Sequence, residues 1–198
     1  MTTGAIILSA GSGRRIAKLG IKPLLKIDGK TFLEIIIDKL EHSGFTPIVV
    51  VVNPTHYAAM ITLRHNAQLC VNQHHDLGML SSLRCGLSHI EKTTQGFMLH
   101  PVDFPLVKPE TYDALMAAHH RHDASIVKPT FEGRHGHPVI FPRLFYHDLT
   151  RAPLSEGARW VQRQHPEQVV SEIVNDPGIL ININTPELYG KYCAKQQH

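Results

Sequence analysis

The sequence predicts an α/β fold: a single Rossmann-like, three-layer domain built around a mostly parallel sheet. Three observations support this prediction. Short apolar runs rich in Val and Ile alternate with segments of helical periodicity, which is typical of βαβ units. The first apolar run, AIIL at 5–8, ends in the glycine-containing turn SAGSG. The chain of 198 residues, 42% of them hydrophobic, is long enough for one domain with a sizeable core.

The first βαβ unit spans residues 5–52. After the strand at 5–8, the segment 31–44 shows a helical stripe of apolar residues that ends at Gly44: Phe32, Leu33, Ile36, Ile37 and Leu40. A continuous run of mainly β-branched residues at 47–52, PIVVVV, then has the composition of a strand covered on both faces. Two strands joined in this way by a helix form a right-handed crossover in nearly all known cases.

The alternation continues through the rest of the chain. We predict helices at 55–63, 81–91 and 109–122 and strands at 68–71, 96–102 and 125–129. The second half is less regular, with a turn and strand at 133–142, a helix at 156–164 and late strands at 169–174 and 178–183. We expect the late strands to fold back over the sheet as a cap on the substrate side. No repeat, linker or domain boundary interrupts 1–198.

The composition excludes several classes of protein. The net charge is only +3, from 20 basic and 17 acidic residues, which is too small for a surface that coats nucleic acid. No stretch approaches the roughly 20 apolar residues that a membrane helix needs, and MTTGAIILSAG lacks the basic start of an export signal. Cys70, Cys85 and Cys193 form no C-x-x-C motif. We therefore expect a cytoplasmic protein with reduced thiols, no disulfide framework and no thiolate zinc site.

Four polar features fall at the ends of predicted strands. The turn SAGSGRR follows the first strand, Asn53 the second, Asn72 the third and Asp103 the fourth. Ligands of open α/β sheets bind beyond the carboxyl ends of the strands. The four features therefore predict one shared pocket.

The turn after the first strand has the character of an anion site. Gly11 and Gly13 allow the backbone amides to approach phosphate oxygens closely. Four cations then follow within a short stretch, at Arg14, Arg15, Lys18 and Lys22. That charge exceeds what a dinucleotide bridge needs and suits a triphosphate that is being cleaved. The alternatives are a glycine turn that serves backbone geometry alone and a solvated basic face.

Asp103 is the candidate metal ligand. It lies in HPVDFPL, between two prolines at the end of an apolar strand. Mg²⁺ favours one or two carboxylates together with phosphate oxygens, whereas the alternative is a turn-capping aspartate. A second oxygen ligand is expected from the late segment ININTPE, which offers Asn182, Asn184 and Glu187.

The 15 histidines do not by themselves indicate a metal site. His119 and His122 have helical ligand spacing but no nearby acid or cysteine to complete a site. The loop at 135–138, His-Gly-His-Pro, is interpreted instead as facing the substrate. Ser81 and Ser82 are interpreted as the start of a helix, where free amides can also hold an anion.

Seven segments, in order, resemble one known family. They are LSAGSGRRI, KPLL at 22–25, GMLSSLRCGL at 78–87, PVDFPLV at 101–107, GRHGHPVIF at 133–141, SEGAR at 155–159 and ININTPEL at 181–188. Together they resemble the MobA-like nucleotidyltransferases of molybdenum-cofactor synthesis and, more distantly, the sugar-phosphate nucleotidyltransferases. The resemblance implies a single GT-A-like domain, with a nucleotide-binding half at about 1–105 and an acceptor-binding half at about 106–198.

The resemblance also implies an activity. The protein would use Mg²⁺ to transfer a nucleoside monophosphate from a nucleoside triphosphate, CTP in preference to GTP, to a phosphate-bearing acceptor such as molybdopterin, and would release pyrophosphate. A cofactor-accepting apoenzyme is a possible partner, and the chain is expected to be a monomer or homodimer. A sugar- or polyol-phosphate nucleotidyltransferase and a non-catalytic nucleotide sensor or cofactor chaperone are the alternatives.

The resemblance assigns roles to individual residues. Arg15 and Lys22 would contact the triphosphate and, with Asp103, carry out catalysis, while Asp103 and Asn184 would hold the metal. The nucleotide would lie against Leu8, Ser9, Ala10, Gly11, Gly13, Asn53, Asn72 and Ser82, and the acceptor against His135, His137 and Arg159.

Two features depart from a single branch of the family. The spacing from Arg15 to Lys22 is longer than in the cofactor enzymes, which leaves Lys18 as an alternative to Lys22. Ala10 and the turn at 136–138 resemble the cytidylyl branch, whereas Asn182 and Asn184 resemble the guanylyl branch. We favour the cytidylyl branch.

Overall fold

The computed structural model describes residues 2–63, 66–90 and 92–193. Its main sheet has the order β10-β7-β9-β6-β1-β4-β5, with the two-residue β8 (Arg134–His135) paired to β7. The strands of the main path are β1 (Thr3–Ser9), β4 (Ile48–Val52), β5 (Gln68–Val71), β6 (Gly96–Pro101), β7 (Ile126–Phe131), β9 (Val139–Pro142) and β10 (Val169–Ile173). β9 is antiparallel to both of its neighbours, and the other pairs along that path are parallel. The predicted mostly parallel sheet is confirmed.

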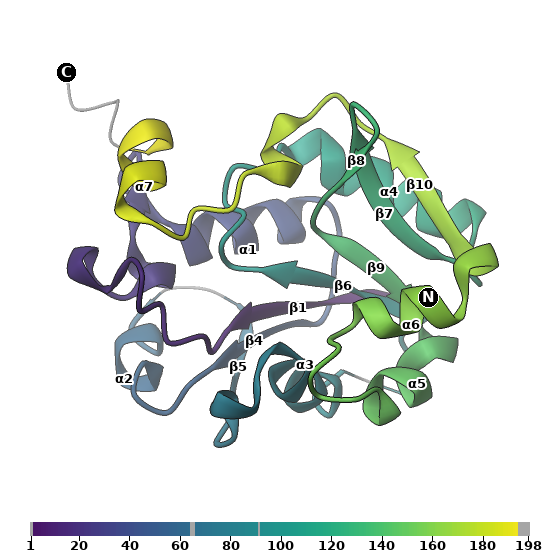
Figure 1. Cartoon of the computed structure of the whole chain (residues 1–198), viewed down its shortest axis with the longest axis horizontal. Helices are drawn as coiled ribbons and strands as arrows, with labels where there is room; N and C mark the ends of the chain where they lie inside the picture. The colour runs from purple at the N-terminus through teal and green to yellow at the C-terminus, as the bar shows by residue number, and fades with distance from the viewer. Residues whose placement is uncertain (1, 64–65, 91, 194–198) are drawn as a thin grey trace.

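Helices cover both faces of the sheet (Figure 1). One face carries α1 (Phe32–His42) and α4 (Pro109–Arg121), and the other carries α3 (Met79–Leu87), α5 (Tyr146–Arg151) and α6 (Arg159–Gln164). The side chains of β1 alternate between these two layers: Ala5 and Ile7 pack with α1 and α4, and Ile6 and Leu8 with α3. This alternation explains why all of β4 and residues 5–8 of β1 are apolar at every position.

The remaining elements are short. α2 (Tyr57–Met60) has four residues where the sequence predicted a helix over 55–63, and α7 (Pro186–Tyr192) ends the described chain. The two-residue strands β2 (Lys26–Ile27) and β3 (Lys30–Thr31) form a separate ribbon before α1. No helix in the described residues has the length and apolarity to cross a membrane.

The late strands differ from the prediction. The run at 169–174 contains β10 at Val169–Ile173, which extends the sheet beside β7 at its edge and does not fold back over it. The run at 178–183 is not a strand: a 3₁₀ turn occupies Pro177–Leu180. The carboxylate of Asp176 accepts the amide of Gly178 at 2.8 Å and starts this turn. Local capping therefore overrides the apolar pattern GILINI.

The expectation of three reduced thiols is wrong for one pair. Cys70 on β5 and Cys85 on α3 form a disulfide, and Cys193 is a buried free cysteine. Because the helix returns across the strand that precedes it, residues 15 positions apart become neighbours. No sequence motif marks that contact.

The buried pair of His100 and Tyr112 gives the fold a pH dependence. Nδ1 of His100 donates to the carbonyl of Pro101 at 2.8 Å, and Nε2 lies 2.7 Å from the hydroxyl of Tyr112. Burial lowers the pKa of His100 to about 3. The folded protein thus holds this imidazole neutral while the unfolded chain protonates it near pH 6.5.

We expect the free energy of unfolding to fall as the pH drops below about 6.5, by up to ~1.4 kcal/mol per pH unit for this one group. Above the unfolded pKa its contribution is complete. Urea unfolding at pH 7.5, 6 and 5 measures the effect. His100→Gln should flatten the pH dependence, whereas substitution of the exposed His120 by Gln should not; equal slopes in both variants would contradict the assignment.

Candidate active site

The carboxyl ends of four neighbouring parallel strands form one edge of the sheet. In the order β6-β1-β4-β5, these ends lead into Asp103, the turn after Ser9, Asn53 and Asn72. The sequence predicted these four features to converge, and the strand order brings them side by side.

A cavity of about 440 Å³ opens at this edge, and we call it the turn cavity. Most of the residues predicted to bind nucleotide or catalyse line it: Leu8, Ser9, Ala10, Gly11, Lys22, Ser82 and Asp103. Arg14, one of the four cations predicted beside the triphosphate, also lines it, together with His75 and Asp76, which the sequence analysis gave no site role. The HHD sequence at 74–76, just before the N-cap of α3 at Gly78, was the available signal for those two.

Lys22 and Asp103 form the central contact of the turn cavity. Nζ of Lys22 donates to a carboxylate oxygen of Asp103 at 3.0 Å, and the side chains are 13% and 24% exposed. A 3₁₀ turn at Lys22–Leu24, with Pro23 buried inside it, fixes the lysine. Lys18, the alternative to Lys22, does not line the cavity. The geometry therefore favours Lys22 over Lys18.

Four other predicted residues lie outside the lining: Gly13, Arg15, Asn53 and Asn72. Gly13 adopts φ +59 and shapes the turn, and the exposed Arg15 does not line the cavity, where Arg14 takes its place. Asn53 is buried: its amide donates to the carbonyl of Ala10 at 3.3 Å, and its oxygen accepts the amide of His56 at 2.8 Å. Its side chain thus supports the turn from beneath.

Asn72 has a similar supporting position. Its amide lies 2.9 Å from the hydroxyl of Ser81 and 3.1 Å from that of Ser82, and its oxygen accepts the amide of His74 at 2.9 Å. The side chain links the end of β5 to the start of α3. It places Ser82 at the turn cavity without lining the cavity itself.

The late segment lies beside Asp103. The amide of Ile183 donates to the carbonyl of Asp103 at 2.8 Å, and Asn182 and Asn184 flank Ile183 in the chain, although neither lines the turn cavity. Oδ1 of Asn182 is buried without a hydrogen-bond partner among the described residues. An unsatisfied amide oxygen is the kind of ligand a hard cation accepts. The described residues hold no cluster of three His, Cys, Asp or Glu side chains that could bind a metal unaided.

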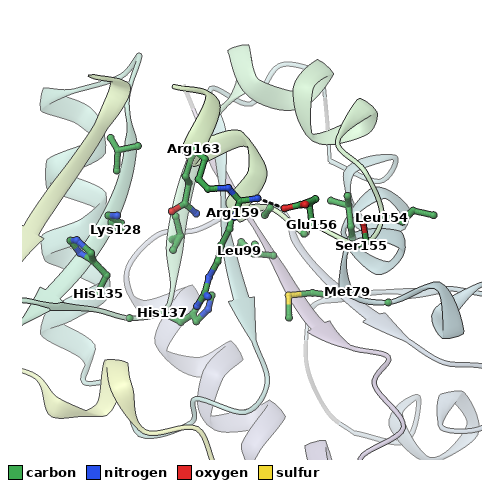
Figure 2. Close-up of a pocket in the computed structure, with 18 of the residues that line it drawn as sticks. Met79, Leu99, Lys128, His135, His137, Leu154, Ser155, Glu156, Arg159 and Arg163 are labelled. Atoms are coloured by element: carbon green, nitrogen blue, oxygen red, sulfur yellow. Dashed lines mark hydrogen bonds and ion pairs between the residues drawn. The ribbon is translucent and has the colours of Figure 1, made fainter. Parts of the chain in front are cut away.

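A larger cavity of about 1200 Å³ lies over the second half of the sheet, and we call it the basic cavity (Figure 2). All three residues predicted to bind the acceptor line it: His135, His137 and Arg159. Lys128 of β7 and Arg163 of α6 join them, and Glu156 pairs with Arg163. Met79, Leu99 and Leu154 supply an apolar wall.

The cations of the basic cavity disfavour one another's charge. Burial, and then the guanidinium of Arg159, lowers the pKa of His137 to about 4 and also lowers the pKa of Lys128. Burial and then Lys128 lower the pKa of His135. Repulsion between cations lowers their pKa values, and a bound anion would offset this repulsion. The cavity is therefore suited to an anionic ligand.

The two cavities are contiguous. Asp76, Gly78 and Met79 line both of them. Gly78 has φ +94, a left-handed conformation that glycine adopts without strain, and it is the N-cap of α3. A molecule in the turn cavity and one in the basic cavity would therefore meet at the start of α3.

Together with this fold, a match to a known family identifies the class of protein as a nucleotidyltransferase. The family model described as "MobA-like NTP transferase domain" matches residues 5–169. The chain belongs to this family of nucleotidyltransferases.

Solved structures share the fold. Rv0371c from Mycobacterium tuberculosis H37Rv is 20% identical, with a TM-score of 0.81 over 96% of this chain and 97% of that one. Molybdopterin-guanine dinucleotide biosynthesis protein A from Archaeoglobus fulgidus is 20% identical, with a TM-score of 0.69 over 96% of each chain.

Curated proteins are also similar in sequence. Bifunctional protein GlmU from Alkaliphilus metalliredigens is 33% identical over 143 residues, 71% of this chain and 31% of the relative. The chain spans about a third or less of the curated relatives it matches.

The geometry distinguishes the two candidate lysines. We expect Lys22→Met to weaken the binding of a nucleoside triphosphate by about tenfold or more, because a charge-assisted contact at a partly buried site is lost. Lys18→Met should change affinity by less than about threefold, as is usual for an exposed cation. Calorimetric titration measures both, and a larger loss in Lys18→Met would reverse the assignment.

Proposed function

We propose that the protein transfers a nucleoside monophosphate from a nucleoside triphosphate, CTP in preference to GTP, to a phosphate-bearing acceptor such as molybdopterin. The observation that carries this proposal is the junction at Asp76, Gly78 and Met79, where a cavity built around Lys22 and Asp103 meets a cation-lined one. A triphosphate and an anionic acceptor need this arrangement, because their reacting atoms must approach in line.

The proposed reaction is a direct displacement. An oxygen of the acceptor phosphate attacks the α-phosphorus and forms a new P–O bond, while the bond between the α-phosphorus and the bridging oxygen breaks. Pyrophosphate leaves with that electron pair. Lys22 and Arg14 offset the charge on the triphosphate, and the amides of the turn at 9–12 orient its oxygens. No covalent intermediate with the protein is needed.

The residues beside Asp103 fit a magnesium ion. Asp103 provides a carboxylate, and the segment tied to its backbone provides the amide oxygens of Asn182 and Asn184. We propose Asp103 and Asn184 as ligands and the buried, unpartnered oxygen of Asn182 as a further donor. A bound Mg²⁺ would offset negative charge on the phosphates. The solved Rv0371C, with a TM-score of 0.76, is complexed with manganese.

The walls of the basic cavity support an acceptor that is both anionic and partly apolar. Lys128, His135 and Arg159 would face its phosphate, and Met79 and Leu154 a ring system (Figure 2). A volume of about 1200 Å³ exceeds what a hexose phosphate needs. A pterin-type acceptor therefore suits this cavity better than the sugar or polyol phosphate of the alternative hypothesis.

Asp103→Ala should abolish Mg²⁺-dependent release of pyrophosphate, a loss of about a thousandfold or more, because the metal would lose its carboxylate. Pyrophosphate is measured with CTP and, separately, GTP, which also tests the preferred base. Asp38→Ala, on the exposed face of α1, is the matched control and should keep normal turnover. Near-normal activity of a folded Asp103→Ala protein would refute the metal assignment.

Arg159→Gln should raise the KM for the acceptor by about tenfold or more and leave the KM for the triphosphate nearly unchanged, because a charged contact to one substrate is removed. Arg159 lines the basic cavity and not the turn cavity. Steady-state kinetics with each substrate varied in turn makes the measurement. Arg151→Gln, at an exposed end of α5, is the control; equal changes in both KM values would argue against two separate subsites.

A further inference from the structure

Lys39 is a partly buried lysine on α1 that none of the roles above uses. Its Nζ donates to the carbonyl of Pro105 at 2.8 Å and to the carbonyl of Val107 at 2.7 Å. Both carbonyls belong to the loop at 103–108, which connects Asp103 to α4. The ammonium therefore clamps the loop that carries the proposed metal ligand.

This placement is costly for a lysine. Burial lowers the pKa of Lys39 to about 8, against the opposing influence of Asp176 and Glu110. A buried ammonium persists only where strong contacts compensate for its lost hydration. The two carbonyl contacts supply that compensation, which indicates that the loop and the lysine hold each other in place.

The same loop is anchored at both of its ends. Ile183 donates to the carbonyl of Asp103 at 2.8 Å. At the other end the carboxylate of Asp176 accepts the amide of Lys108 at 2.8 Å and the hydroxyl of Thr111 at 2.7 Å. Lys39 holds the middle of the loop.

α1 also supports the partner of Asp103. The amide of Phe32 donates to the carbonyl of Leu25 at 2.8 Å, and α1 packs against the turn that carries Lys22. The helix itself is well fixed: Thr31 and Glu34 form a capping box at its start, and its apolar stripe is buried. One rigid helix thus supports both sides of the ion pair between Lys22 and Asp103.

We propose that Lys39 is a positioning residue, which holds the loop at Pro105 and Val107 and thereby sets where Asp103 lies relative to Lys22 and the metal. This inference rests on the proposed role of Asp103 as a metal ligand. Lys39 itself lines neither cavity and does not touch the substrates.

The test compares Lys39→Met, Lys39→Arg and the control Lys30→Met. Lys30 is an exposed lysine of β3, just before α1, and it donates to Asp38 of α1 at 2.6 Å. The control therefore removes a cation that contacts α1 without touching the loop. The readouts are the Mn²⁺ concentration that gives half-maximal pyrophosphate release and the direct binding of Mn²⁺, followed by electron paramagnetic resonance with triphosphate present.

We expect Lys39→Met to raise both metal constants by about tenfold to a hundredfold, as the loss of outer-shell support does at metal sites. Lys39→Arg should recover most of the affinity, since a guanidinium can also donate to two carbonyls. Lys30→Met should stay within about twofold of the parent protein, as expected for an exposed pair.

Unchanged metal constants in a folded Lys39→Met protein would overturn the proposal. A lower melting temperature and kcat with unchanged metal constants would also overturn it, because that result describes a purely structural lysine. If Lys39→Met does not fold, Lys39→Gln, which keeps one donor on a shorter side chain, replaces it under the same criteria.

Asp103→Ala separates the two proposals. If that variant keeps metal-dependent turnover, the metal role of Asp103 fails and the inference about Lys39 fails with it. If Asp103→Ala is inactive while the Lys39 variants bind Mn²⁺ normally, only the inference about Lys39 is wrong.

Discussion

The ion pair between Lys22 and Asp103 joins positions 81 residues apart, and the geometry of the turn cavity depends on it. Both side chains are largely withdrawn from water, so each charge needs the other while no substrate is bound. A triphosphate with its metal offers both groups stronger partners, phosphate oxygens for the ammonium and a cation for the carboxylate. The pair thus keeps the two groups ordered and adjacent before substrate arrives, which reduces the reorganisation needed at the moment of reaction.

The basic cavity differs from the turn cavity in its charges, because it contains several cations close together and not a cation paired with an anion. Burial, and then the neighbouring Arg159, lowers the pKa of His137 to about 4, so its imidazole is neutral at physiological pH. Burial, and then Lys128, lowers the pKa of His135. Only Glu156, through Arg163, supplies a countercharge among the ion pairs of the described residues at this cavity. An anionic group bound between these side chains would relieve their mutual repulsion. The repulsion among these cations is therefore unfavourable while the cavity is empty, and its relief would favour the binding of an anion.

The features of the fold and of the site that could be predicted from the sequence are those set by residues close together in the chain. β-branched runs such as PIVVVV gave the central strands, and strand ends gave the edge at which Asp103 and the glycine turn converge. Asn53 and Asn72 were predicted at the correct edge of the sheet. Alternation along a strand, however, does not indicate where a side chain points after the strand ends. Both side chains support loops from beneath and do not line the turn cavity. The apolar run at 178–183 was misread as a strand because the capping carboxylate of Asp176 dominates there.

The residues of the basic cavity were predicted from the family resemblance and not from local patterns, because they meet only through topology. Lys128 lies on β7, Arg159 starts α6 and Met79 starts α3, and the antiparallel β9 lies between β7 and β6 in the sheet. No pattern in the sequence reveals that strand order. Parallel strands direct their carboxyl ends to one edge automatically, so the nucleotide side follows from βαβ alternation alone. The reversal at β9 instead carries the chain across the sheet, so that residues 128, 137 and 159 line one cavity beside Gly78. The edge that carries the turn cavity is thus encoded locally, while the basic cavity depends on the order in which the later strands assemble.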